Sequence, residues 1–111
     1  MEYHVEERAT IDPLDKYINS HESNRLTLTF DEGDTYVCDL LTAYEADNGL
    51  ALDDPAYDEF YEIAFLIRET LADGPNKEEG YGTVLLNYKH FPARIVAEDG
   101  TEVYRREDWV G

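Results

Sequence analysis

Apolar and polar residues alternate along two neighbouring segments in the first half of the chain, which predicts two strands joined by a turn. Residues 25–30 place Leu, Leu and Phe at every second position, so these side chains share one face of an extended segment. Residues 31–34 are Asp, Glu, Gly and Asp, a composition typical of turns. Residues 35–46 predict a returning strand. Its apolar pattern changes phase near Leu40, which indicates a β-bulge or a strand covered on both faces.

Two other segments carry helix signals. Asp12 and Asp54 each precede a proline, the arrangement of an N-cap followed by proline in the first turn. A short helix is predicted over about 13–21. A long helix is predicted over about 55–72, because apolar residues recur there at helical spacing until a Gly-Pro pair stops the pattern. We expect this long helix to form the centre of the core.

The remaining segments predict a loop and further strands. Residues 73–82 hold three glycines and a proline and predict a loop. Residues 83–88 are apolar enough for a central strand. Residues 94–97 and 102–105 flank an Asp-Gly turn and predict a β-hairpin. Residues 2–9 alternate weakly and predict an edge strand.

Composition favours one folded domain. The chain has 111 residues, 42% of them hydrophobic, with nine tyrosines and four phenylalanines for a core. We therefore expect a single acidic α+β domain over residues 1–111, with an antiparallel sheet of about 4–6 strands on which the two helices pack. The sequence shows neither an export signal nor a run of about 20 apolar residues, so we expect a cytoplasmic protein that does not enter a membrane.

Negative charge is the dominant feature of the sequence. The formal net charge is −17, and no lysine or arginine occurs between Arg25 and Arg68, an interval that holds eleven carboxylates. This charge disfavours direct binding to nucleic acid and attracts a basic protein. Tyrosines lie among these acids, and tyrosine with carboxylate suits the binding of Lys and Arg. The candidate partner-binding residues are Asp31, Glu32, Asp34, Tyr44, Glu45, Asp47, Asp53, Tyr57, Asp58, Glu59 and Glu62.

Catalytic and metal-binding patterns are missing from the sequence. There is no P-loop, no nucleophile elbow and no zinc-ligand spacing, and the acidic segment 45–54 lacks the spacing of an EF-hand. The single cysteine, Cys38, occupies an apolar strand position beside Asp39, whose charge raises the pKa of a thiol. We therefore expect a buried thiol, no enzymatic activity, no cofactor and no metal.

Three hypotheses for function follow. The favoured one is a non-enzymatic protein that occupies a basic, nucleic-acid-binding surface of a partner protein, as an inhibitor, an immunity protein or a nucleic-acid mimic. This comparison rests on size and charge and not on a matched motif. Alternatively, the acidity is an adaptation to high salt or serves solubility. In the third hypothesis the loop 73–82 is the lid of a small ligand-binding domain or enzyme, which requires a pocket between that loop and the sheet.

Overall fold

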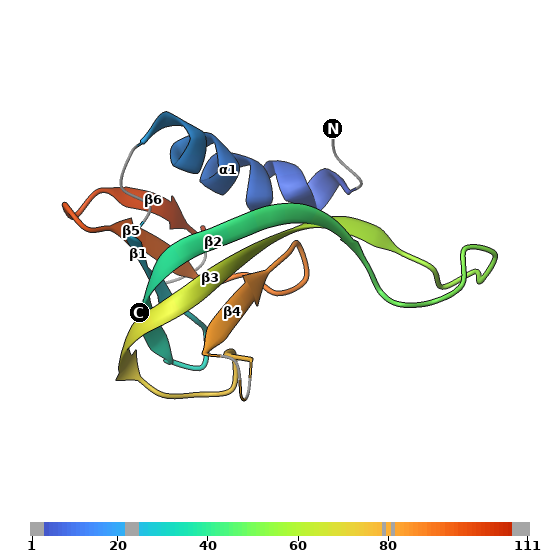
Figure 1. Ribbon diagram of the computed structural model, residues 1–111. Coiled ribbons are helices and arrows are strands. Elements are labelled where there is room, and N and C mark those ends of the chain that lie inside the picture. The colour runs from blue at the N-terminus through green and yellow to red at the C-terminus, as the bar shows by residue number, and fades with distance from the viewer. Residues whose placement is uncertain (1–3, 22–24, 79, 81, 108–111) are drawn as a thin grey trace.

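In the described residues the fold is one antiparallel sheet with one α-helix packed against it (Figure 1). The computed structural model describes residues 4–21, 25–78, 80 and 82–107. The elements are the 3-10 helix η1 (Val5–Arg8), α1 (Ile11–Ser20), β1 (Arg25–Thr29), β2 (Thr35–Asp47), β3 (Glu59–Ala72), β4 (Thr83–Leu86), β5 (Arg94–Ala97) and β6 (Glu102–Arg105). The six strands lie in the order β4-β3-β2-β1-β5-β6. The predicted α+β class is confirmed, and the strand count falls within the predicted 4–6.

The core lies between the sheet and α1. All five of the strands β1 to β5 contribute buried apolar side chains to it, and Ile11 and Leu14 of α1 complete it. The short helix predicted over 13–21 is confirmed, with its start two residues earlier. Pro13 is accommodated in the first turn, where a backbone N–H has no helical partner. In the described ranges, no helix is long and apolar enough to cross a membrane.

The long helix predicted over about 55–72 is wrong, because residues 59–72 form strand β3. This strand pairs with β2 from Asp47↔Glu59 to Thr35↔Ala72. Its residues are rich in aromatic and β-branched types, which favour strands. Ile63 and Phe65 are buried on the core face, as the period of a strand requires, although the same segment also fits helical spacing.

Two further predictions are wrong. The segment 83–88 was expected to be a central strand, but β4 lies at one edge of the sheet and pairs only with β3. Its apolar character instead reflects the burial of Val84 and Leu86 in the core. The edge strand expected over 2–9 is replaced by η1, while residues 1–3 lie outside the described part of the chain.

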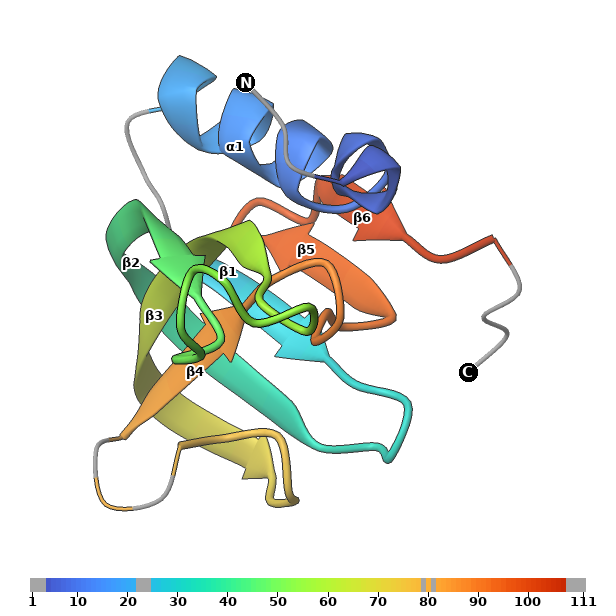
Figure 2. The same ribbon diagram turned by 90° about the vertical axis from the view of Figure 1, so that its right-hand side faces the viewer.

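The β2–β3 hairpin is longer than the strands beside it. β1 pairs with β2 only at residues 35–39, and β4 pairs with β3 only at residues 63–66. The predicted bulge is confirmed by a register shift between Leu40 and Thr42, where the hairpin leaves the sheet. Residues 41–62 form a two-stranded ribbon with a loop at its end, which we call the arm. The arm projects from the body in Figure 1 and points toward the viewer in Figure 2. The molecule measures 44 Å along its longest axis, against 30 and 29 Å along the others.

Candidate functional site

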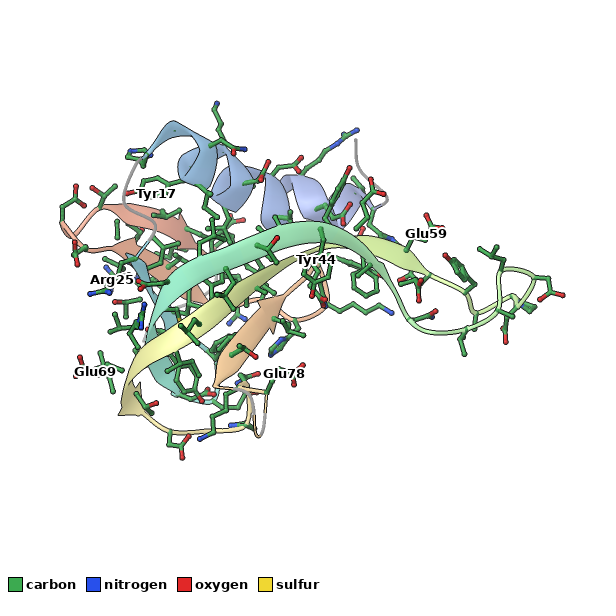
Figure 3. All side chains as sticks on the ribbon, viewed as in Figure 1. Tyr17, Arg25, Tyr44, Glu59, Glu69 and Glu78 are labelled. Carbon is green, nitrogen blue, oxygen red and sulfur yellow. The ribbon has the colours of Figure 1, made fainter. Side chains whose placement is uncertain are left out.

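The arm carries negative charge that no basic residue of its own offsets. Residues 41–62 contain seven carboxylates and neither lysine nor arginine. Figure 3 shows Glu59 toward the outer end of the ribbon. Within the described part of the chain, ion pairs to the arm involve Asp58 alone, through His4 and Lys89. The arm therefore presents an acidic surface, with carboxylates on both strands and in the loop.

The basic residues neutralise carboxylates elsewhere on the molecule. Asp39 lies between Arg25 and Arg68, with Nε–Oδ distances of 2.7 and 2.6 Å, and hydrogen bonds from these two guanidinium groups hold its pKa well below the usual range. Arg106 pairs with Asp31 at 2.6 Å. These pairs place three arginines on the body of the sheet, whereas Lys89 pairs with Asp58 of the arm at 3.8 Å, so most carboxylates of the arm keep their field.

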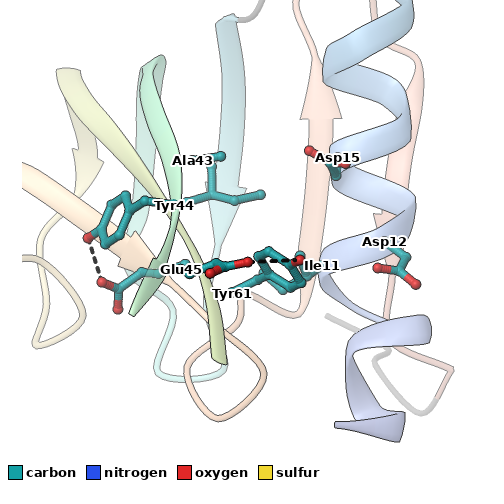
Figure 4. A pocket seen from close by; sticks show the side chains of 9 residues that line it. Ile11, Asp12, Asp15, Ala43, Tyr44, Glu45 and Tyr61 are labelled. Carbon is teal, nitrogen blue, oxygen red and sulfur yellow. Dashed lines mark hydrogen bonds between the residues drawn. The ribbon is translucent and has the colours of Figure 1, made fainter. Parts of the chain in front are cut away.

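Tyrosine hydroxyls hold several carboxylates of the arm in place. Tyr44 donates to Glu62 across the two strands, and Tyr61 donates to Glu45 at 3.4 Å. The two tyrosine rings point to opposite sides of the ribbon (Figure 4). Burial, together with the hydrogen bond to Glu62, raises the pKa of Tyr44 to about 12, so its hydroxyl stays a donor at neutral pH. Carboxylates fixed in this way lose little conformational entropy when they bind a partner.

A cavity of about 370 Å³ between the arm and α1 continues the acidic surface (Figure 4). Its carboxylates come from both sides: Asp12 and Asp15 belong to α1, and Glu45 and Glu62 belong to the arm. Tyr61 forms part of its wall. Asp12 and Asp15 were not among the residues predicted from the sequence. They lie about thirty positions before the arm, and only the fold brings them beside it.

Asp58 anchors the arm at the point where its loop meets β3. Its two carboxylate oxygens lie 2.6 Å from His4 Nε2 and 2.6 Å from the Tyr88 hydroxyl, and the rings of His4 and Tyr88 stack with their centroids 3.9 Å apart. The hydrogen bond from Tyr88, with a contribution from His4, lowers the pKa of Asp58. Asp58 thus ties η1 and the segment after β4 to the arm, and much of its hydrogen-bonding capacity is used within the molecule.

Glu7 closes the outer edge of β3 beside Asp58. Its side chain is fully buried, and its carboxylate accepts hydrogen bonds from the backbone N–H of His4 at 3.1 Å and of Tyr61 at 2.8 Å. His4 Nε2 lies 3.0 Å from the backbone oxygen of Glu59 on the same edge. An exposed strand edge invites pairing with other chains, and η1 covers this one with side-chain hydrogen bonds.

The candidate residues predicted from the sequence divide into two groups. Eight of them lie on the arm: Tyr44, Glu45, Asp47, Asp53, Tyr57, Asp58, Glu59 and Glu62. Asp31, Glu32 and Asp34 lie in the turn before β2, at the opposite end of that strand. A thirteen-residue strand spans roughly 40 Å at 3.3 Å per residue, so the two groups do not form one surface.

Asp34 supports the turn from inside. Its buried carboxylate accepts hydrogen bonds from the Tyr36 hydroxyl at 2.9 Å and from the backbone and side-chain nitrogens of Asn76 at 3.0 and 2.9 Å. Burial opposes the charged form, but the hydrogen bonds outweigh it and lower the pKa of Asp34. Glu32 also accepts from Asn76, at 2.7 Å. Asp34 therefore connects the turn to the loop after β3.

The loop 73–82 gives no support to the lid hypothesis. A hollow of about 430 Å³ lies against it, and among the described residues its lining is Lys77, Glu78, Gly80 and Gly82. All four belong to the loop itself, and no strand of the sheet takes part within that lining. This hollow is therefore not the pocket between loop and sheet that the hypothesis requires.

The chain matches a family of known proteins. A family model described as "Cognate immunity protein YxxD" matches residues 9–108, a range that contains α1, all six strands and the entire arm. No curated protein and no solved structure matches the chain.

Proposed function

Because this chain belongs to the family of cognate immunity proteins described as YxxD, we propose that it neutralises its partner toxin by placing the arm on a basic, nucleic-acid-binding surface of that toxin. The observation that carries the proposal is the charge of the arm, seven carboxylates with no lysine or arginine among them. Lysine and arginine bind carboxylates and phosphates through the same charge-assisted hydrogen bonds. The carboxylates of the arm would then occupy the places that phosphates take. The protein acts as an inhibitor and performs no chemistry.

The shape of the arm supports this mode of binding. Its two strands lie about 4.8 Å apart, so the ribbon is narrow enough to enter a cleft that accepts a nucleic-acid strand. The exposed face of Tyr44 offers a surface for arginine or lysine beside the Glu62 carboxylate. Attraction over the whole arm also accelerates the encounter with a basic partner, which suits a protein that must reach a toxin before the toxin acts.

A pair of matched triple variants tests the proposal. Glu45→Gln, Asp47→Asn and Asp53→Asn remove three exposed charges from the arm. As a control, Glu69→Gln, Glu98→Gln and Glu107→Gln remove three exposed charges elsewhere. Each triple changes the formal net charge from −17 to −14. The measurements are the Kd for the purified toxin by calorimetry, and the survival of cells that produce the toxin together with each variant.

The arm variant is expected to bind much more weakly than the control. A charge pair at 4 Å in water contributes about 1 kcal/mol, so three pairs correspond to a loss of about 100-fold in affinity at low salt. The control loses only the weaker long-range attraction that both variants share. If the two variants bind the toxin equally well, the arm is not the contact surface, even if the protein protects cells.

A further inference from the structure

Two leucines stand exposed at the tip of the arm. Leu52 is 82% exposed and Leu50 is 42% exposed, and neither belongs to the hydrophobic core. They lie in the loop between β2 and β3, at the end of the ribbon that projects furthest from the body (Figure 1). A single exposed leucine needs no explanation, but two of them at one projecting point form an apolar tip on a strongly acidic protein.

Hydrogen bonds hold this loop in a defined conformation. The loop is closed by a backbone hydrogen bond from Asn48 to Asp58 at 3.1 Å, and the side-chain amide of Asn48 donates to the Ala56 oxygen at 2.8 Å. Backbone bonds from Asp54 to Ala51 and from Tyr57 to Asp54, both 2.9 Å, form two successive turns inside it. The leucines therefore project from an ordered loop, and less conformational entropy is lost when such a loop binds.

We propose that Leu50 and Leu52 are the apolar anchor of the complex and enter a hydrophobic pocket with a basic rim on the cognate toxin. This inference rests on the proposed function and names the part of the arm that fixes the complex. Asp47, Asp53 and Asp54 are exposed around the two leucines, so the complementary site has lysine or arginine around an apolar floor. Stable interfaces are built in this way, with an apolar centre that dominates affinity and a polar rim.

Truncation of the leucines tests the anchor. Leu52→Ala is expected to raise the Kd for the purified toxin by about tenfold to 100-fold, and the Leu50→Ala/Leu52→Ala double variant by more. The factor by which the Kd rises is expected to be nearly equal at low and high salt, because salt screens charges and not apolar contacts. Leu52→Met, which keeps an apolar side chain of similar volume, is expected to retain most of the affinity, whereas Leu52→Asn is not.

Leu71→Ala is the matched control. Leu71 is 56% exposed and lies near the other end of β3, away from the arm. All these side chains are exposed, so the variants are expected to keep the wild-type Tm, and Tm is measured for each. If the wild-type protein binds the toxin and the double variant binds as tightly as Leu71→Ala, the leucines are not the anchor of the complex, and the proposed function stands. If the wild-type protein does not bind the toxin, both proposals are overturned.

Discussion

Glu7 is a buried carboxylate whose replacement tests how η1 holds the arm. One of its oxygens accepts from the backbone N–H of His4 and the other from that of Tyr61. Glu7→Gln keeps the volume of the side chain but replaces one acceptor oxygen with an NH₂ group. One of the two backbone donors then faces another donor and loses its hydrogen bond.

The size of the effect follows from these contacts. A polar group left unsatisfied in a buried place costs about 1–3 kcal/mol. The entropy of unfolding is about 2.1 cal/mol/K per residue, which gives roughly 230 cal/mol/K for a chain of 111 residues. A loss of about 2 kcal/mol then lowers Tm by about 9 °C. Glu7→Ala removes both acceptors and leaves a cavity, so its Tm is expected to fall further.

Differential scanning calorimetry measures this effect, with Glu6→Gln as the control. Glu6 is the neighbouring residue, its side chain is exposed, and its replacement changes the net charge by the same amount. The control therefore accounts for any gain in stability that comes only from reduced charge repulsion. A Tm for Glu7→Gln within about 2 °C of the Glu6→Gln value would refute the role assigned to the buried carboxylate, since about 2 °C corresponds to only about 0.5 kcal/mol.

Three further predictions concern the turn at Asp34 and the core. Asp34→Asn is expected to be less stable than wild type in urea unfolding. Because the pKa of Asp34 is lowered in the folded state, the difference in free energy of unfolding between the two proteins is complete above about pH 4 and disappears as the pH falls through the folded pKa. A difference that stays constant with pH would contradict this. Gly74→Ala is expected to lower Tm by several degrees, because a Cβ there would lie 2.5 Å from the Asp34 Cβ. An unchanged Tm would show that the turn moves to accommodate the added Cβ at no cost in stability. Burial, with the charge of Asp39, raises the pKa of Cys38 to about 12, so a thiol reagent at pH 8 is expected to react only with unfolded protein, and rapid reaction of the folded protein would contradict this.

Elements whose signals are local were predicted correctly from the sequence. The β5–β6 hairpin has the residue ranges expected from its Asp-Gly turn, and Gly100 adopts the positive φ of 91° that the turn needs. The strand at 25–29 follows its period of two in the same way. In these segments neighbouring residues alone decide the conformation, so the sequence is sufficient.

The strand β3 was mistaken for a helix because its apolar residues fit both periods. Ile63 and Ile67 belong to a helical stripe and also to one face of a strand, and a run of apolar residues does not distinguish the two. Its fourteen residues also exceed the usual strand length of about five or six, which favoured the helix. The hydrogen bonds to β2 decide the outcome, and such non-local pairing is not visible in a periodic pattern.

The sequence predicted the acidic interval but not its division in space. The register places Tyr44 opposite Glu62 and thereby builds the arm, whereas Asp34 turns into the protein at the other end of β2. Asp12 and Asp15 join the acidic surface from α1. Proximity between distant segments arises from the fold, so charge counted along the chain identifies a region and not a surface.

The dependence of toxin binding on salt tests most directly whether the arm binds a basic surface. Calorimetry with the wild-type protein and its purified toxin at 50, 150 and 500 mM KCl provides the Kd at Debye lengths that shorten from above 10 Å to below it. The seven unpaired or partly paired carboxylates of the arm predict that the Kd rises by about tenfold or more over this range. A Kd that does not change with salt would show that the complex does not depend on the charge of the arm.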